Sequence, residues 1–191
     1  MLFRSRPGAG GNIAAEAVFR APADGYSILS ISKGNIFANL LYDNLAFDFG
    51  KEFIALAGMA TGPLLMLVHP SVPVNTLPEF IAYAKANPTK VNYGTPGISS
   101  DPHLTTEWLK MLTGLTIPHV PYRGGALALT DLLAGNIQLM FSNLPAAQYI
   151  KEGKLKALAV TSLKRIPEYP DLPPVSDTLP GFESKIGRAH V

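Results

Sequence analysis

The chain has 191 residues, of which 47% are apolar and 16% are charged, a composition typical of a folded globular protein. Its formal charge of +2 is small and its Lys and Arg residues are scattered, which argues against binding of nucleic acid. It has no cysteine and no apolar run long enough for a membrane span, which excludes disulfides, thiolate metal sites and direct membrane insertion by a helix.

The two ends of the chain do not look like natural protein sequence. Residues 186–191 read Ile-Gly-Arg-Ala-His-Val, one translated frame of a common short-read sequencing adapter, and residues 1–5 read as its complementary strand. We therefore expect residues 1–5 and 186–191 to be artefacts that pack against nothing. The alternative is a genuine short protein with unusual termini. No signal peptide is visible.

Helix-like and strand-like patterns alternate along the chain, which predicts an α/β fold. The elements expected before residue 70 are a helix over 13–21, a strand over 26–31, a short helix ending at Leu41, and two strands within 53–68 that break at 61–63. The clearest helix follows Thr76, which forms a predicted capping box with Glu79. Asn87-Pro88 ends this helix.

A second long helix is expected to begin after Ser100 and to end at Gly114. Helical spacing predicts that its core face consists of Leu104, Trp108, Met111 and Leu112. The other elements expected in this half are strands over 91–93, 117–122, 137–141 and 155–160, a helix from Gly124 to Gly135 with Ala126, Leu129 and Leu133 inward, and a short helix over 146–151.

Residues that could carry chemistry are sparse. His69, His103 and His119 lie in different segments without a second ligand at metal-binding spacing, so we expect no metal site. No Gly-x-Ser-x-Gly motif is present, and Ser99-Ser100 has no evident base in sequence reach. The glycine-rich run 8–11 matches neither a P-loop nor a dinucleotide-binding fingerprint. The sequence therefore predicts no catalytic residues and no cofactor.

Three loops of small residues each run into the start of a predicted helix, at 32–35, 95–100 and 122–126. The first amides of a helix are unpaired and lie at the positive end of its dipole, so they can hold a carboxylate without a formal cation. For any single loop the simpler interpretation is helix capping, as by Ser100. Three such loops in one chain favour a pocket for a small anion.

Several motifs share an order and spacing with a known family. They are Arg-Pro-Gly-Ala-Gly-Gly-Asn at 6–12, Asp-Gly-Tyr at 24–26, the helix segment 78–88, His-Val-Pro-Tyr-Arg-Gly at 119–124, the segment 128–135, Asn-Leu-Pro at 143–145 and Leu-Ala-Val-Thr-Ser at 158–162. Through essentially all of 6–182 the chain resembles the Bug family, the substrate-binding receptors of tripartite tricarboxylate transporters.

The resemblance implies a periplasmic receptor with a two-lobe clamshell fold, like the type II periplasmic binding proteins, and no enzymatic activity. Such receptors bind small carboxylated metabolites such as dicarboxylates, tricarboxylates, amino acids or aromatic acids. They deliver these ligands to the membrane subunits of a transporter or to a sensor kinase. A regulatory ligand-sensing domain, or an enzyme on the same fold, is the alternative.

The resemblance also implies a fragment. Residues 6–67 would form part of lobe one, 68–157 lobe two, and 158–185 a return to lobe one. The signal peptide, the first strand and helix with their ligand-binding loop, and the C-terminal completion of lobe one would be missing.

Carried over by position, the resemblance implies ligand-binding residues in both lobes. They would be Ser32 in lobe one and, in lobe two, Thr95, Gly97, Ser99, Ser100, His103, Tyr122, Gly124, Gly125, Ala126 and Asn143. Two departures leave the ligand open, because Asp101 replaces a small hydroxyl residue and Ser142 replaces a common acid. Asp101 either faces solvent as a first-turn acid or faces the cleft, where it would repel a second ligand carboxylate.

Overall fold

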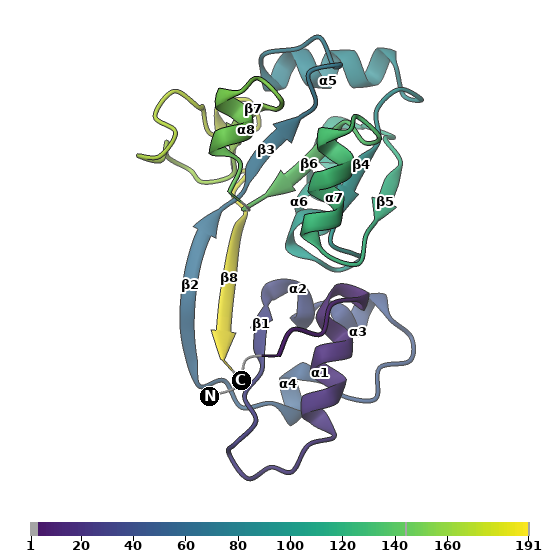
Figure 1. Cartoon of the computed structure of the whole chain (residues 1–191), viewed down its shortest axis with the longest axis vertical. Coiled ribbons are helices and arrows are strands. Elements are labelled where there is room, and N and C mark those ends of the chain that lie inside the picture. The colour runs from purple at the N-terminus through teal and green to yellow at the C-terminus, as the bar shows by residue number, and fades with distance from the viewer. Residues whose placement is uncertain (1–3, 144, 191) are drawn as a thin grey trace.

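The computed structural model describes residues 4–143 and 145–190, which form two α/β lobes (Figure 1). Lobe one, residues 4–63 and 185–190, contains a three-stranded sheet in the order β1-β8-β2. Lobe two, residues 64–184, contains a five-stranded sheet in the order β5-β4-β6-β3-β7. The predicted α/β fold with two lobes is confirmed.

Lobe one is the smaller body and has short elements. These are η1 (Ala9–Gly11), α1 (Asn12–Phe19), β1 (Ser30–Ser32), α2 (Lys33–Ile36), α3 (Ala38–Leu41), α4 (Phe49–Glu52), β2 (Ala57–Pro63) and β8 (Lys185–His190). Its core is small and centres on Phe47, whose ring lies 5.1 Å from that of Phe49 in an edge-to-face arrangement. The strand expected over 26–31 is confined to β1, because its partner β8 pairs only with Ser30–Ser32.

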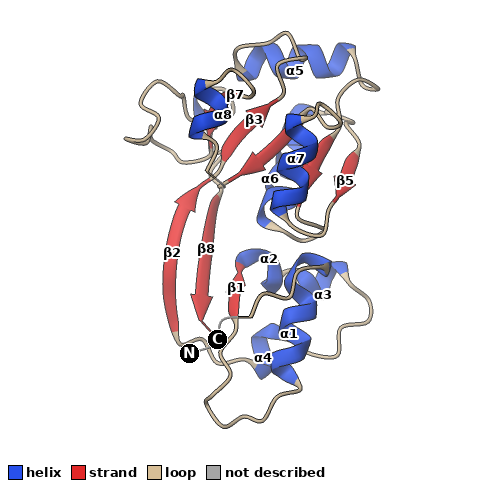
Figure 2. Ribbon diagram, viewed as in Figure 1, coloured by secondary structure: helices blue, strands red, loops and turns tan. Residues whose placement is uncertain are grey.

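Lobe two has helices on both faces of its sheet (Figure 2). Its elements are β3 (Leu65–Val68), α5 (Leu77–Ala86), β4 (Tyr93–Thr95), α6 (Asp101–Thr113), β5 (His119–Pro121), α7 (Gly125–Leu133), β6 (Leu139–Ser142), α8 (Ala147–Lys151), β7 (Lys156–Val160) and η2 (Val175–Asp177). All four residues of β3 are buried because α5 and α6 cover one face and α7 covers the other.

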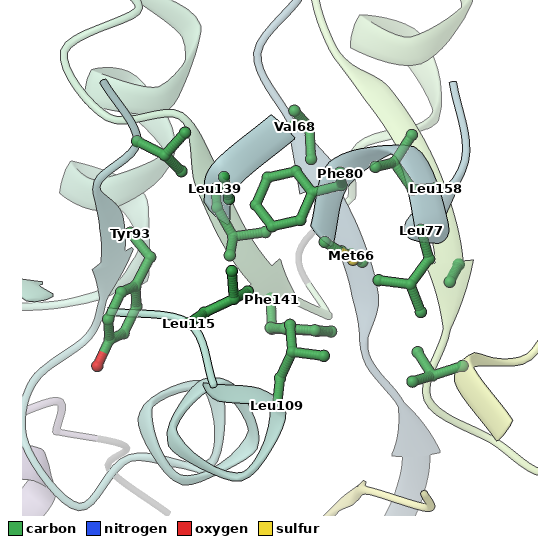
Figure 3. Packing of buried hydrophobic residues seen from close by; sticks show 14 of the residues in the cluster. Met66, Val68, Leu77, Phe80, Tyr93, Leu109, Leu115, Leu139, Phe141 and Leu158 are labelled. Carbon is green, nitrogen blue, oxygen red and sulfur yellow. The ribbon is translucent and has the colours of Figure 1, made fainter. Parts of the chain in front are cut away.

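The larger core of lobe two lies between the sheet and helices α5 and α6. Figure 3 shows Phe80 from α5 and Leu109 from α6 with Met66 and Phe141 from the central strands, all of them fully buried or nearly so. Burial of side chains of this size contributes about 1.5–3 kcal/mol each. This core therefore makes lobe two a firm base for the loops at the edge of its sheet.

The capping signals place the two long helices of lobe two correctly. Thr76 Oγ1 accepts from the Glu79 backbone N–H at 3.3 Å, whereas the Glu79 carboxylate accepts from the backbone N–H of Asn75, one residue earlier than expected for a capping box. Ser100 caps α6, and Gly114 ends it with φ 69°, a left-handed conformation that glycine adopts without steric cost.

The predicted core face of α6 was right for Trp108, which stacks on Phe182 against the larger core, and wrong for Met111 and Leu112. Met111 is 73% exposed and Leu112 is 47% exposed. The buried residues of this helix are Asp101, Pro102, Thr105, Thr106, Leu109 and Thr113. The three threonines can be buried because each hydroxyl is hydrogen-bonded, Thr106 and Thr113 to carbonyls four residues earlier and Thr105 to Ser184. On α7, Ala126 is likewise exposed rather than inward.

The prediction that residues 186–191 pack against nothing was wrong for the part that the structure describes. Strand β8 lies between β1 and β2 and is antiparallel to both, and Ile186 packs against the core of lobe two. Strand pairing is made by backbone groups, so many different sequences can occupy such a place. Arg4 and Ser5 are exposed outside any helix or strand, and residues 1–3 and 191 lie outside the described residues.

The chain passes between the lobes at Leu64 and again between Ser184 and Lys185. Thr161 joins the two passages, because its Oγ1 accepts from Leu64 N at 2.8 Å and its carbonyl accepts from Ser184 N at 2.9 Å. Strands β3 and β7 pair with each other inside lobe two. The lobe boundaries thus differ from those expected at 67/68 and 157/158. Val175 and Phe182 pack in the core of lobe two, which holds most of 158–185 there.

Within the described part of the chain, no helix has the length and hydropathy required to cross a lipid bilayer.

Candidate functional site

Three strands of lobe two bring the predicted loops to one edge of the sheet. Strands β4, β5 and β6 run parallel, with Thr95 opposite Pro121 and Tyr93 opposite Leu139. Their carboxyl ends therefore lie side by side, which is where open α/β sheets bind ligands. The ten predicted site residues of lobe two lie in the loops that leave this edge or in the strand and helix ends next to them. Two of these loops are joined by Tyr122 N, which donates to Thr95 O at 2.9 Å.

Lobe one meets this edge through α2 and the loop before α1 (Figure 1). A Cβ atom on Gly34 would lie 2.0 Å from Ser99 O, and one on Gly10 would lie 2.3 Å from Ile98 O. The two backbones are thus in direct contact, and glycine is required at both lobe-one positions. We call residues 8–12 and 32–35 of lobe one, together with 97–101 of lobe two, the lobe junction.

Ser32, predicted to bind the ligand from lobe one, lies in the lobe junction at the N-terminal cap of α2. Its backbone N–H donates to Asn35 Oδ1 at 3.0 Å, and Asn35 Nδ2 donates to Gly10 O at 3.1 Å. Asn35 thereby holds the loop before α1 against the start of α2.

Asn12 is a residue of the lobe junction that the sequence analysis did not single out. It is the first residue of α1, only 5% exposed, and both its Oδ1 and its Nδ2 are buried without a hydrogen-bond partner among the described residues. A buried polar group left unpaired costs about 1–3 kcal/mol, so such an amide marks a place for a ligand or a water molecule. The sequence could have indicated Asn12, because the small residues of 8–11 run into the start of a helix as the other three loops do.

Ser99 is the corresponding residue of lobe two. It is fully buried with φ 66°, a left-handed conformation that costs about 1–3 kcal/mol in a residue other than glycine. Its Oγ has no partner of ordinary hydrogen-bond geometry among the described residues. The Tyr42 hydroxyl is nearby and donates to Ile98 O at 3.3 Å. Burial raises the pKa of Tyr42, and its interaction with the Ser99 side chain opposes that effect.

The side chain of Ser100 is used to cap its own helix, α6. Its Oγ donates to Gly97 O at 2.7 Å and accepts from His103 N at 3.4 Å, which is the N-cap role that we regarded as the simpler interpretation. Asp101 is 2% exposed, and its Oδ1 accepts from Gly34 N of lobe one at 3.2 Å. The possibility that Asp101 is a solvent-facing acid was therefore wrong.

A series of polar contacts holds the start of the lobe-two loop, residues 95–97, in place. His119 Nε2 lies 2.7 Å from Thr95 Oγ1, which in turn bonds both N–H and carbonyl of Gly97 at 3.2 Å. The His119 ring lies 4.7 Å from that of Tyr93 and 4.5 Å from that of His103. These contacts fix Thr95 and Gly97 before the chain reaches Ser99.

Both imidazoles in this stack favour the neutral form. Burial, with a smaller contribution from His103, lowers the pKa of His119 to about 4, and burial also lowers the pKa of His103. Nδ1 of His103 is buried and has no partner within the residues described. At neutral pH, His103 and His119 therefore position the loop and supply no cationic charge to a ligand.

The carboxylate next to these histidines, that of Glu107, is bonded to other side chains. Glu107 accepts a short hydrogen bond from the Tyr93 hydroxyl and forms an ion pair with Lys110 Nζ at 2.7 Å. Burial raises the pKa of Tyr93, and Glu107 raises it further. For Glu107, burial is outweighed by the contacts with Lys110 and Tyr93, so the pKa of its carboxyl is lowered.

The remaining predicted residues surround the start of α7. The Tyr122 hydroxyl donates to Asp131 Oδ2 at 2.6 Å, and burial together with that bond raises the pKa of Tyr122 to about 12, so this hydroxyl turns toward α7. Gly124, with φ 129°, and Gly125 begin α7, and no described side chain caps this helix. Asn143 is exposed at the end of β6.

Among the described residues, no three His, Asp or Glu side chains lie close enough together to hold a metal ion.

Comparison with known proteins identifies the family and the fold. The family model described as tripartite tricarboxylate transporter family receptor matches residues 1–187. A UPF0065 protein of Bordetella pertussis is 38% identical over 174 residues, which are 90% of this chain and 54% of that protein. The protein BugT of the same organism is 31% identical over 180 residues, which are 93% of this chain and 55% of BugT. The chain thus spans about half the length of the relatives that it matches.

Solved structures show the same fold. The periplasmic binding protein BugD matches with a TM-score of 0.90 and 35% identity, covering 96% of this chain and 62% of BugD. The protein Rpa4515 of R. palustris, solved with adipate, matches with a TM-score of 0.89 and 35% identity, covering 97% of this chain and 63% of that protein. From the family match along nearly its whole length, the chain belongs to the family of tripartite tricarboxylate transporter receptors.

Proposed function

We propose that this chain is the larger part of a periplasmic receptor that captures a small carboxylate between its two lobes and delivers it to a membrane transporter or a sensor. Its family and the adipate bound by a structural relative support the carboxylate class. We expect binding without catalysis: among the described residues, the carboxylate beside His103 and His119 is that of Glu107, and it is held by Tyr93 and Lys110.

The observation that carries the proposal is the presence of buried, unpaired polar atoms from both lobes at the lobe junction. Asn12 supplies an amide from lobe one and Ser99 a hydroxyl from lobe two. The loop that precedes Asn12 lies against Ser99, because a Cβ on Gly10 would lie 2.6 Å from Ser99 Oγ. A ligand that pairs with both side chains would recover the cost of burying them and would hold the lobes together.

Backbone amides would supply most of the attraction for the carboxylate. Helices α1 and α7 both follow a glycine N-cap, Gly11 and Gly124, without a side-chain cap among the described residues. The backbone N–H of Asn12 donates to Ala9 O, so the amides after it in α1 and the first amides of α7 would be available to an anion, whereas α6 is already capped by Ser100. Neutral donors of this kind suit a receptor that must also release its ligand.

The test is a screen of organic acids against the intact receptor, by thermal shift and then by calorimetry. We expect at least one small carboxylate to raise the melting temperature and Asn12→Ala to weaken its binding about tenfold, since one hydrogen bond to a charged group is worth about 1.5–3 kcal/mol. Asn75→Ala, a change at an exposed asparagine before α5, should leave binding unchanged. Absence of binding by any carboxylate, or equal effects of the two changes, would contradict the proposal.

A further inference from the structure

The lobe junction contains a carboxylate that belongs to the protein itself. Asp101 of lobe two is 2% exposed and accepts through Oδ1 from the backbone N–H of Gly34 in lobe one, 67 residues away. This is the kind of bond that a bound carboxylate makes with a backbone amide. In this chain it joins the two lobes with no external anion.

The approach of the two lobes at this point is too close for a ligand atom to come between them. A Cβ on Gly34 would lie 2.0 Å from Ser99 O and 3.4 Å from Asp101 N. One turn further along α6, Thr105 Oγ1 lies 2.6 Å from Ser184 Oγ, which accepts from Lys33 Nζ at 3.0 Å. Helix α6 therefore holds the start of α2 at two successive turns, directly through Asp101 and by way of Ser184 through Thr105.

The charge of Asp101 is close to the unpaired groups of the junction. It is two residues from Ser99, whose Oγ is buried, and it is excluded from water by the same contacts. Charges interact more strongly in a buried site than in water, because less solvent screens them. A small ligand held at Ser99 would therefore lie close to Asp101.

Resting on the proposed function, we propose that Asp101 determines specificity: it supplies from within the chain the carboxylate that bridges the lobes, and it excludes ligands with a second carboxylate. The receptor therefore closes on a monocarboxylate. A dicarboxylate of the same length would place its second anion beside Asp101 and would lose affinity by repulsion between like charges.

Two variants separate the charge of Asp101 from its hydrogen bond. Asp101→Asn keeps an acceptor for Gly34 N–H but removes the charge, whereas Asp101→Ala removes both. The control is Glu79→Gln, which neutralises an exposed acid in the first turn of α5, far from the junction. The intact receptor and the three variants are titrated by calorimetry with hexanoate and adipate, and with butanoate and succinate, at two salt concentrations.

We expect the unaltered receptor to bind the monocarboxylate of at least one pair tenfold or more tightly than the matching dicarboxylate. Asp101→Asn should reduce that ratio at least tenfold, Asp101→Ala should weaken all ligands, and Glu79→Gln should change neither. Tighter binding of the dicarboxylates by the unaltered receptor overturns the proposal even if no variant folds, and so does an unchanged ratio in Asp101→Asn. Carboxylate binding with the wrong ranking leaves the proposed function intact, whereas no carboxylate binding at all overturns both.

Discussion

The Nε2 atom of His119 lies 2.7 Å from the hydroxyl oxygen of Thr95, and this contact joins edge strand β5 to the loop that lobe two presents to lobe one. The same imidazole is stacked on Tyr93 and tilted against His103, so the loop is supported by two histidine rings whose charge state depends on pH. Lowering the pH is therefore expected to destabilise lobe two through protonation of His119 and His103.

Burial lowers the pKa of His119 to about 4 and lowers that of His103, whereas an unfolded histidine titrates near 6.5. Between these values the unfolded state binds the proton and the folded state does not. The stabilising effect is thus fully present above about pH 6.5 and is lost as the pH falls toward 4. We expect a loss on the order of 1–2 kcal/mol, reduced from the full shift by solvent screening.

Urea unfolding of the intact receptor at a series of pH values measures this loss. His119→Gln should flatten the dependence below pH 6.5, because glutamine keeps a polar partner for Thr95 but does not titrate. His69→Gln is the control, since His69 follows β3 near the amino-terminal end of β6, at the other end of the strands from the lobe junction. The same slope in His119→Gln as in the unaltered protein would show that other groups cause the pH dependence.

Gly34→Ala should weaken ligand binding at least tenfold while leaving each lobe folded. The added methyl would lie 2.0 Å from Ser99 O, so the two lobes could not approach as closely as they do here. Gly58→Ala is the matched control, because a Cβ at Gly58 in β2 would contact nothing within 4 Å. Calorimetry measures the binding and circular dichroism the fold, and equal affinities for the two variants would rule out a requirement for this close contact.

Two residues on α6 should differ sharply in their contribution to stability. Leu109 is fully buried in the larger core, so Leu109→Ala should lower the free energy of unfolding by about 2–5 kcal/mol. Met111 is 73% exposed, so Met111→Ala should change it by less than about 0.5 kcal/mol. Denaturant unfolding of the intact receptor measures both, and similar losses would restore the core face that was predicted from helical spacing.

Lobe one should exchange its amide hydrogens faster than lobe two. Large apolar side chains are exposed across lobe one, including Leu40 at 81% and Ile54 at 80%, and its core is small. Local opening is easiest where few apolar contacts are buried. Hydrogen exchange of the isolated chain should show β1 and β8 opening well before β3 and β6, and uniform protection across both lobes would contradict this.

Much of the local structure was determined by the sequence by itself. Thr76, Ser100 and Gly114 mark helix ends because capping depends on residues next to one another in the chain. The apolar residues of β3 indicated a buried strand for a similar reason. The family motifs are also local, and for that reason the fold class and the loops of lobe two could be predicted before the structure.

The tertiary structure decided which faces and atoms meet across long separations. Asp101 binds Gly34, Thr105 binds Ser184, and β8 pairs between β1 and β2, and each contact joins segments whose approach no local pattern encodes. The unpaired amide of Asn12 also became visible only when its surroundings were known. Hydrogen bonding and burial depend on distances in space, so a residue such as Asp101 could be recognised as unusual from the sequence, but its position at the lobe junction was settled by the packing of the two lobes.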